Sequence, residues 1–233
     1  MKIALLGYGK MGKAIEKIAL EKGHEIVLRK SVDDSYDGLE SADVAIEFSI
    51  PTSAVVNITT CLNAGIPVVS GTTGWLDDYE IVTKLCEEKG GSFIYGSNFS
   101  LGVNLFFELN AYLAKMMAKF PDYKVSMEET HHTQKLDAPS GTAISLARDV
   151  IKYSDYSSWA LEDAKEDEIL IDAKRIENVP GTHIVSYNSN VDKIEISHTA
   201  HSRDGFALGA VLAAEWILGK TGVYSMKDVL NLK

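Results

Sequence analysis

A stretch near the middle of the chain brings several chemically active residue types close together. It reads ETHHTQKLDAPSGTA and covers residues 129–143. The adjacent histidines His131 and His132 can exchange protons near neutral pH, and Lys135 adds a fixed positive charge. A predicted helix begins directly behind them. This combination suits the donation of a proton to a negatively charged substrate.

The second half of the stretch predicts an anion-binding site. Ser140, Gly141 and Thr142 follow Pro139 and begin a helix whose first N–H groups have no partner within the helix. These groups lie at the positive end of the helix dipole, where anions bind favourably. Lys135 is placed to add its charge, so we predict a bound carboxylate. An ordinary Ser/Thr helix cap would leave the same pattern.

The two histidines end a predicted strand, so their side chains should point to opposite faces. One is expected to face the reaction and the other the substrate or the loop. Structural packing is the alternative explanation for such a pair. We predict no metal site, because no nearby cysteine or carboxylate pattern completes a set of ligands.

A glycine motif near the N-terminus, GYGKMG, fits the pattern GxGxxG. It follows a short apolar run and opens a helical pattern, which is the context in which this motif binds a dinucleotide. The glycines permit a tight turn, and the helix N-terminus receives the pyrophosphate. A glycine-rich turn without a ligand is the alternative. The predicted cofactor contacts are Gly7, Tyr8, Gly9, Lys10, Met11 and Gly12.

The second predicted strand ends in Leu28, Arg29 and Lys30. Many dinucleotide-binding folds place an acid here to bind the ribose hydroxyls. Arg29 instead suits a 2′-phosphate, because a guanidinium can bind phosphate through two hydrogen bonds. Two solvated surface charges are the alternative. We predict that NADPH is used at least as well as NADH.

Two further loops follow predicted strands of the same sheet, where such folds bind ligands. Their small, hydroxyl-bearing residues can approach the nicotinamide end of a cofactor. The residues concerned are Gly71, Thr72, Thr73, Ser97, Asn98, Phe99 and Ser100.

The composition excludes several classes of function. The 233 residues carry a formal net charge of −10, which argues against nucleic-acid or anionic-membrane partners. Cys61 and Cys86 lack metal-ligand spacing and indicate free thiols in a reducing compartment. The short N-terminal apolar run is broken by glycines and lysines. We therefore predict no signal peptide or membrane span and expect a cytoplasmic protein.

The order of predicted elements indicates an α/β fold with two domains. Residues 1–101 alternate strand and helix patterns, which predicts a Rossmann-type doubly wound parallel sheet. A C-terminal helix, 206–233, is expected to pack back on this domain. Residues 102–205 predict a smaller α+β domain for substrate binding and oligomerisation. Its sheet should be mixed and largely antiparallel, with consecutive strands over 169–200 paired through turns. Hinges are expected near Leu101 and Arg203.

Six blocks of the sequence carry a resemblance to a known family. In chain order they are GYGKMG, EFSIPTS, GTTG, SNFSLGVN, HHTQKLDAPSGTA and SHTAHSRDGFALGA. The fifth block is the most specific, and the similarity extends over essentially the whole chain. The sequence resembles the dihydrodipicolinate reductase family.

This resemblance implies an enzyme that reduces a small cyclic dicarboxylate, 4-hydroxy-tetrahydrodipicolinate, with NADPH or NADH in lysine and diaminopimelate biosynthesis. It implies a homotetramer. By position, His131 would be the catalytic acid/base and Lys135 the proton donor, whereas His132 and the Ser140, Gly141 and Thr142 segment would bind a substrate carboxylate.

Two alternative functions stay open from the residues themselves. One is another nicotinamide-dependent dehydrogenase acting on an amino dicarboxylate such as aspartate. The other is a protein that senses a dinucleotide without turnover. The pairing of His131 with Lys135 argues against the sensor, which would need only the loops of the first domain.

Replacing His131 by glutamine tests the assignment of the acid/base. Glutamine cannot exchange a proton near neutral pH, so turnover should fall by about 100-fold. Affinity for the cofactor should stay near normal, because the cofactor is expected on the other domain. Steady-state rates and a fluorescence titration with NADPH measure the two quantities. A parallel loss of both would make His131 a structural residue.

Overall fold

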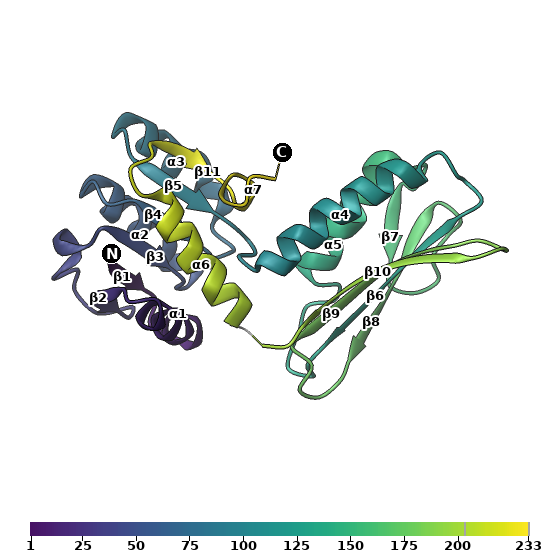
Figure 1. Ribbon diagram of the computed structural model, residues 1–233, viewed down its shortest axis with the longest axis horizontal. Coiled ribbons are helices and arrows are strands. Elements are labelled where there is room, and N and C mark those ends of the chain that lie inside the picture. The colour runs from purple at the N-terminus through teal and green to yellow at the C-terminus, as the bar shows by residue number, and fades with distance from the viewer. Residues whose placement is uncertain (203, 233) are drawn as a thin grey trace. The chain divides into compact units, whose positions relative to one another are not determined.

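The structure is a computed structural model that describes residues 1–202 and 204–232. The chain divides into two compact units (Figure 1). The first contains Met1–Leu101 and the segment that follows Ser202, and the second is Gly102–Ser202. The hinge predicted near Arg203 lies outside the described residues.

The first unit is built on a six-stranded sheet in the order β11-β5-β4-β3-β1-β2. All neighbouring strands are parallel, which confirms the predicted doubly wound sheet. The strands are β1 (Lys2–Leu6), β2 (Glu25–Lys30), β3 (Val44–Glu47), β4 (Val68–Ser70), β5 (Ser92–Tyr95) and β11 (Gly222–Tyr224). The α-helices are α1 (Lys10–Glu21), α2 (Pro51–Asn63), α3 (Tyr79–Glu88), α6 (Asp204–Ile217) and α7 (Met226–Val229).

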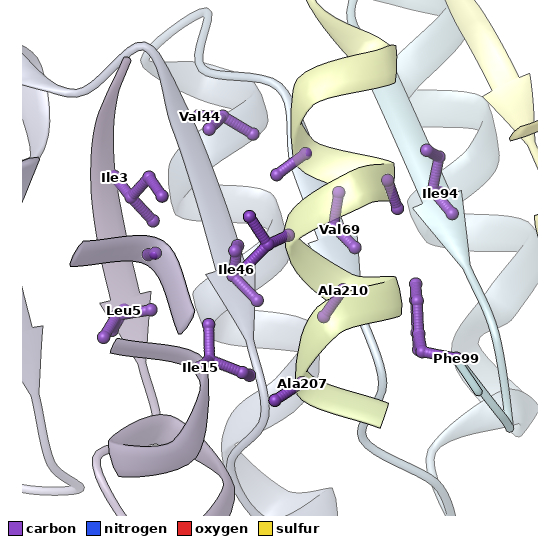
Figure 2. Packing of buried hydrophobic residues seen from close by; sticks show 14 of the residues in the cluster. Ile3, Leu5, Ile15, Val44, Ile46, Val69, Ile94, Phe99, Ala207 and Ala210 are labelled. Atoms are coloured by element: carbon purple, nitrogen blue, oxygen red, sulfur yellow. The ribbon is translucent and has the colours of Figure 1, made fainter. Parts of the chain in front are cut away.

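Side chains from alternate positions of the central strands fill two separate cores, one on each face of the sheet. Ile3 and Leu5 of β1 belong to one core, and Ala4 and Leu6 belong to the other. This alternation follows from the two-residue period of a strand, and burial on both faces is typical of parallel sheets. Figure 2 shows the first core, in which Ile46, Val69 and Ile94 lie beneath α6 (Ala207 and Ala210).

The C-terminal segment differs from the single helix predicted over 206–233. Helix α6 ends at Ile217, and Gly219 follows with a φ of +72°, a conformation that favours glycine and ends helices. The chain then forms β11, which pairs with β5 at the edge of the sheet, and the short helix α7. Helix α6 packs against α1 and the central strands, as its apolar sequence predicts.

The second unit is a five-stranded sheet in the order β10-β9-β6-β8-β7. Its strands are β6 (Lys124–His131), β7 (Ser158–Ala160), β8 (Glu168–Arg175), β9 (Gly181–Asn188) and β10 (Lys193–Ala200). The helices α4 (Leu101–Met117) and α5 (Gly141–Tyr153) cover one face (Figure 1). Met127, Ile171, Val185 and Leu146 pack together in the core between sheet and helices.

The mixed sheet confirms the predicted fold class, but it is not largely antiparallel as predicted, because two of its four strand pairings are antiparallel and two are parallel. The order of pairing also differs. Strands β9 and β10 form the expected antiparallel pair, whereas β8 does not pair with β9. Strand β6 lies between them, antiparallel to β9 and parallel to β8. The turn residues after β8 led us to predict that β8 pairs with β9. The spacing of these residues does not reveal that β6, from an earlier part of the chain, lies between the two strands. This strand order brings the C-terminal end of β6 beside both β8 and β9.

Within the described residues, none of the helices has the length and apolar character needed to cross a membrane.

Replacing Gly209 by alanine tests the packing of α6 on the first unit. A Cβ atom at this position would lie 1.7 Å from the backbone oxygen of Phe99, so the backbone must shift. We expect a loss of about 2 kcal/mol in the free energy of unfolding, measured by urea denaturation. Gly9→Ala is the matched control, because no heavy atom lies within 4 Å of its Cβ position. Equal stability of the two variants would contradict the close approach.

Candidate active site

The glycine loop has the geometry that a dinucleotide requires. Gly7 has a φ of +102°, and a Cβ atom on it would lie 2.0 Å from the backbone oxygen of Phe48. A Cβ on Gly12 would lie 2.3 Å from the oxygen of Gly7. Gly9 is the N-cap of α1 and has open space around it. The loop therefore leaves the start of α1 accessible to a phosphate group.

A cavity of about 260 Å³ opens beside this loop. Its lining includes Gly7, Tyr8, Gly9, Phe48 and Asn57. Lys10 is exposed, and Met11 packs partly against the first core. A cavity bounded by a glycine turn and the start of a helix fits the diphosphate and ribose of a dinucleotide.

The two cations at the end of β2 occupy different environments. The guanidinium of Arg29 donates to the carboxylate of Glu16 on α1, with 2.8 Å between Nε and Oε1. The hydroxyl of Tyr8 donates to the other oxygen of Glu16. Both contacts hold the pKa of Glu16 below its usual range. Arg29, the predicted phosphate contact, is thus already paired with a carboxylate.

Lys30 lines the cavity and is buried. Its ammonium donates to the carbonyl oxygens of Ser31 and Val32, at 2.9 and 3.1 Å. It lies 4.7 Å from the ring centroid of Tyr36. In the described parts of the chain, no carboxylate forms an ion pair with Lys30. Lys30 therefore offers the cavity a positive charge that Arg29 does not.

The loops after β3 and β4 are organised around the fully buried carboxylate of Glu47. It accepts from the hydroxyl of Ser70 at 2.7 Å and from that of Thr72 at 2.9 Å. The hydroxyl and backbone N–H of Ser49 donate to the same side chain. Thr72 was predicted to approach the cofactor, but its hydroxyl is engaged in this internal network.

The remaining predicted contacts of the first unit have different surroundings. Phe99 is buried in the first core and its ring lies 5.5 Å from that of Phe48. A Cβ on Gly71 would lie 2.2 Å from the ring of Phe48, so this glycine permits the close packing. Asn98 accepts from the N–H of buried Ser100. Thr73 and Ser97 are exposed at the loop surface.

In the second unit, β6 places Glu129 and His131 on the face that the helices cover. Glu129 has no exposed surface, and its Oε2 accepts from the backbone N–H of Ser140 at 2.9 Å. The same oxygen lies 3.8 Å from Nδ1 of His131 and 3.7 Å from Nε2 of His183. Its Oε1 lies 3.3 Å from the guanidinium of Arg175. One carboxylate thus connects three strands with the start of α5.

Ser140 is the N-cap of α5, as predicted, and its hydroxyl accepts from the N–H of Ala143 at 3.1 Å. Nε2 of His183 lies 3.1 Å from the same hydroxyl oxygen. The amide and hydroxyl of Ser140 thus both have partners within the protein, and its contact with a substrate carboxylate stays a prediction. The first-turn amides of Gly141 and Thr142 have no acceptor within the helix, as the predicted anion site requires.

Arg175 also holds the loop that carries Lys135. Its guanidinium donates to the carbonyl oxygens of Lys135 and Asp137, at 3.3 and 2.7 Å. The ammonium of Lys135 binds both carboxylate oxygens of Asp137, at 2.8 and 2.7 Å. This contact lowers the pKa of Asp137. A substrate carboxylate must therefore compete with Asp137 for Lys135.

Burial determines the protonation of the two histidines beside Glu129. It lowers the pKa of His131, with Lys135 and Arg175 acting in the same direction and Glu129 opposing them. Burial lowers the pKa of His183 to about 4. Both rings are therefore mainly neutral at pH 7. His131 can exchange a proton there, whereas His183 acts as an uncharged hydrogen-bonding partner of Ser140.

Ligand atoms of Glu129, His131 and His183 lie within 4.8 Å of one another, a spacing that a metal ion could bridge. The other contacts disfavour an ion, because Arg175 faces one oxygen of Glu129 and the amide of Ser140 donates to the other. The absence of a metal stays a prediction. His132 follows the end of β6 and is half-buried.

Sequence reasoning missed Glu129, Arg175 and His183 as site residues. Glu129 carried a usable signal, because a residue two positions before His131 on a strand shares its face. The others come from separate strands, and nothing in their local sequence connects them with the site.

Comparisons with known proteins identify the same family in both parts of the chain. The family model for the N-terminus of dihydrodipicolinate reductase matches residues 1–99, and the model for its C-terminus matches residues 102–230. The 4-hydroxy-tetrahydrodipicolinate reductase of Christiangramia forsetii is 58% identical over 99% of this chain and 98% of its own length. That of Methanosarcina barkeri is 37% identical over 97% of this chain and 83% of its own.

A solved structure shares the fold. It is the dipicolinate-bound dihydrodipicolinate reductase of Paenisporosarcina sp. TG-14, with a TM-score of 0.78 and 22% identity. The match covers 100% of this chain and 99% of that one.

Replacing Lys30 by methionine tests which cation recognises the 2′-phosphate of NADPH. We expect KM for NADPH to rise about tenfold, because one charged hydrogen bond is lost, while KM for NADH changes little. Arg29→Met is the matched control and should change the ratio of the two KM values less, because Arg29 is paired with Glu16. If only Arg29→Met changes the ratio, the assignment from sequence is the right one.

Proposed function

The chain belongs to the dihydrodipicolinate reductase family, and we propose that it reduces 4-hydroxy-tetrahydrodipicolinate to tetrahydrodipicolinate with NADPH or NADH. The observation that carries this proposal is the arrangement at the end of β6 and the start of α5. There, His131 and Lys135 share one loop region with the first-turn amides of Gly141 and Thr142. A proton-exchanging group, a cation and an anion-binding helix start are what the reduction of a cyclic dicarboxylate needs.

The first unit supplies the cofactor site. The close approaches at Gly7 and Gly12 and the adjoining cavity fit a dinucleotide. When bound, NAD(P)H provides a hydride for transfer to substrate. The exposed start of α1 would hold the diphosphate, and Lys30 would face the adenosine ribose. The reaction requires the substrate held by the second unit to reach this cofactor, so we expect closure through the hinge near Leu101.

The second unit supplies the binding of substrate and the proton. One substrate carboxylate would accept from the amides of Gly141 and Thr142, with the ammonium of Lys135 as counter-ion. Loss of the 4-hydroxyl group as water leaves a conjugated ring, which takes a hydride at C4 and a proton at C3. His131 and Lys135 would supply that proton and the positive charge. His132 would contact the substrate at the end of β6.

The assembly and the compartment belong to the same proposal. We propose a homotetramer in the cytoplasm, with a role in lysine and diaminopimelate biosynthesis. The face of the second sheet opposite α4 and α5 supports an assembly, because it carries the exposed side chain of Leu170 and the half-buried side chain of Ile184 among polar ones. The two cysteines are buried free thiols, which suits a reducing compartment.

One set of assays distinguishes this function from its alternatives. Oxidation of NADPH in the presence of freshly formed 4-hydroxy-tetrahydrodipicolinate is the expected result. Oxidation of aspartate with NADP⁺ would indicate an amino-dicarboxylate dehydrogenase. Binding of NADPH without turnover in either assay would indicate a sensor.

Replacing Lys135 by methionine should weaken substrate binding. Loss of a charge-assisted hydrogen bond costs about 1.5–3 kcal/mol, so KM for the substrate should rise about tenfold to a hundredfold. Turnover should fall further if Lys135 donates the proton. Lys119→Met, on an exposed residue after α4, is the matched control. Wild-type kinetics in Lys135→Met would remove Lys135 from both roles.

A further inference from the structure

The carboxylate of Glu129 has more partners than a structural ion pair needs. It is fully buried, accepts from the amide of Ser140, and lies beside the guanidinium of Arg175 and the rings of His131 and His183. Burying a carboxylate is costly unless donors surround it, and an apolar side chain of similar size would often be as stable. Its position between the acid/base and the anion-binding helix indicates another role.

We propose that Glu129 is a positioning residue, which fixes the start of α5 for carboxylate binding and sets the proton affinity of His131. The proposal rests on the proposed function and deepens it. The two effects arise from the same oxygen, because Oε2 both accepts from Ser140 and faces Nδ1 of His131. Glu129 does not touch the substrate in this role. It acts through Ser140, which fixes the start of α5, and through His131.

The first effect is geometric. By accepting from the amide of Ser140, Glu129 takes up the N–H that precedes the first turn of α5. The hydroxyl of Ser140 is held from the other side by His183 and by the N–H of Ala143. The N-cap residue is therefore fixed at both its backbone and its side chain. The amides of Gly141 and Thr142 then point in one direction, as a preorganised anion site requires.

The second effect is electrostatic. Glu129 raises the proton affinity of His131, whereas burial, Lys135 and Arg175 lower it, and Asp137 opposes them. Neutral His183 faces His131 with 5.0 Å between ring centroids. Within the described residues, Nδ1 of His131 has no hydrogen-bond partner. A protonated Nδ1 is therefore favoured by the facing Glu129, which leaves Nε2 as the atom that exchanges protons.

Replacing Glu129 by glutamine removes the charge and keeps the size of the side chain. The pKa of His131 should fall by about one unit, because a negative charge within 4–6 Å typically has an effect of that order. The imidazole resonances of His131, assigned by comparison with His131→Gln, report this value in an NMR titration without substrate. The pH limb of kcat/KM that follows His131 should move to lower pH by the same amount, and kcat should fall at least tenfold.

Glu128→Gln is the matched control. Glu128 is the preceding residue of β6, and its side chain pairs with Lys174 on the open face of the sheet. The substitution changes the net charge equally and removes a carboxylate one residue away. It should leave the His131 titration, kcat and the KM for NADPH unchanged. An equal shift in both variants, or no shift in Glu129→Gln, would overturn the proposal.

Arg175→Gln gives a second test with the opposite sign. Arg175 lowers the proton affinity of His131, so its removal should raise the pKa in the same titration. If Glu129→Gln does not fold, this variant still tests the proposal. An unchanged or lowered pKa of His131 in Arg175→Gln would count against it. The titration needs no turnover. Wild-type protein without reductase activity would contradict the proposed function, whereas an absent shift would contradict only the role of Glu129.

Discussion

A carboxylate without access to water must be surrounded by donors, and each unit of this protein contains one at the end of a central strand. In the first unit Glu47 gathers the hydroxyls of Ser49, Ser70 and Thr72. In the second, Glu129 gathers the amide of Ser140 and the guanidinium of Arg175. Ser49, Thr72 and Ser140 lie on loops, so satisfying the two carboxylates also fixes those loops.

This arrangement explains how short loops can be held in one conformation. A loop held only by its ends samples many conformations, whereas a loop whose donors converge on one buried acceptor has few. The buried carboxylates are unfavourable for stability, but they orient the loop groups that are expected to bind a ligand. The exposed members of the same loops, such as Thr73 and Gly141, are left free to meet a ligand. The buried residues of a loop therefore hold its conformation, and the exposed residues are the ones that a ligand can contact.

The sequence was most informative where the chemistry is local. The glycine loop and the helix start at Ser140 each depend on residues within a few positions, and the structure has both. Arg29 and Lys30 show where prediction from sequence stops. Both are cations at the end of one strand, and only the fold determines that Glu16 pairs with Arg29. His183 and Arg175 reach the site through strand order, because β6 inserts between β8 and β9. Spacing along the chain does not encode that insertion.

The parallel sheet of the first unit is completed only by residues that follow the second unit in the chain. During synthesis, the strands β1 to β5 emerge first, and the surface formed by Ile46, Val69 and Ile94 must wait for α6. The edge of β5 likewise stays unpaired until β11 has been made. A nascent chain that stops after Ser202 thus exposes an apolar sheet face and an unpaired strand edge, both of which promote aggregation. The first unit becomes whole only once the second unit has been made, so a chain that ends early lacks one strand of the six-stranded sheet and the helix that covers one of its faces.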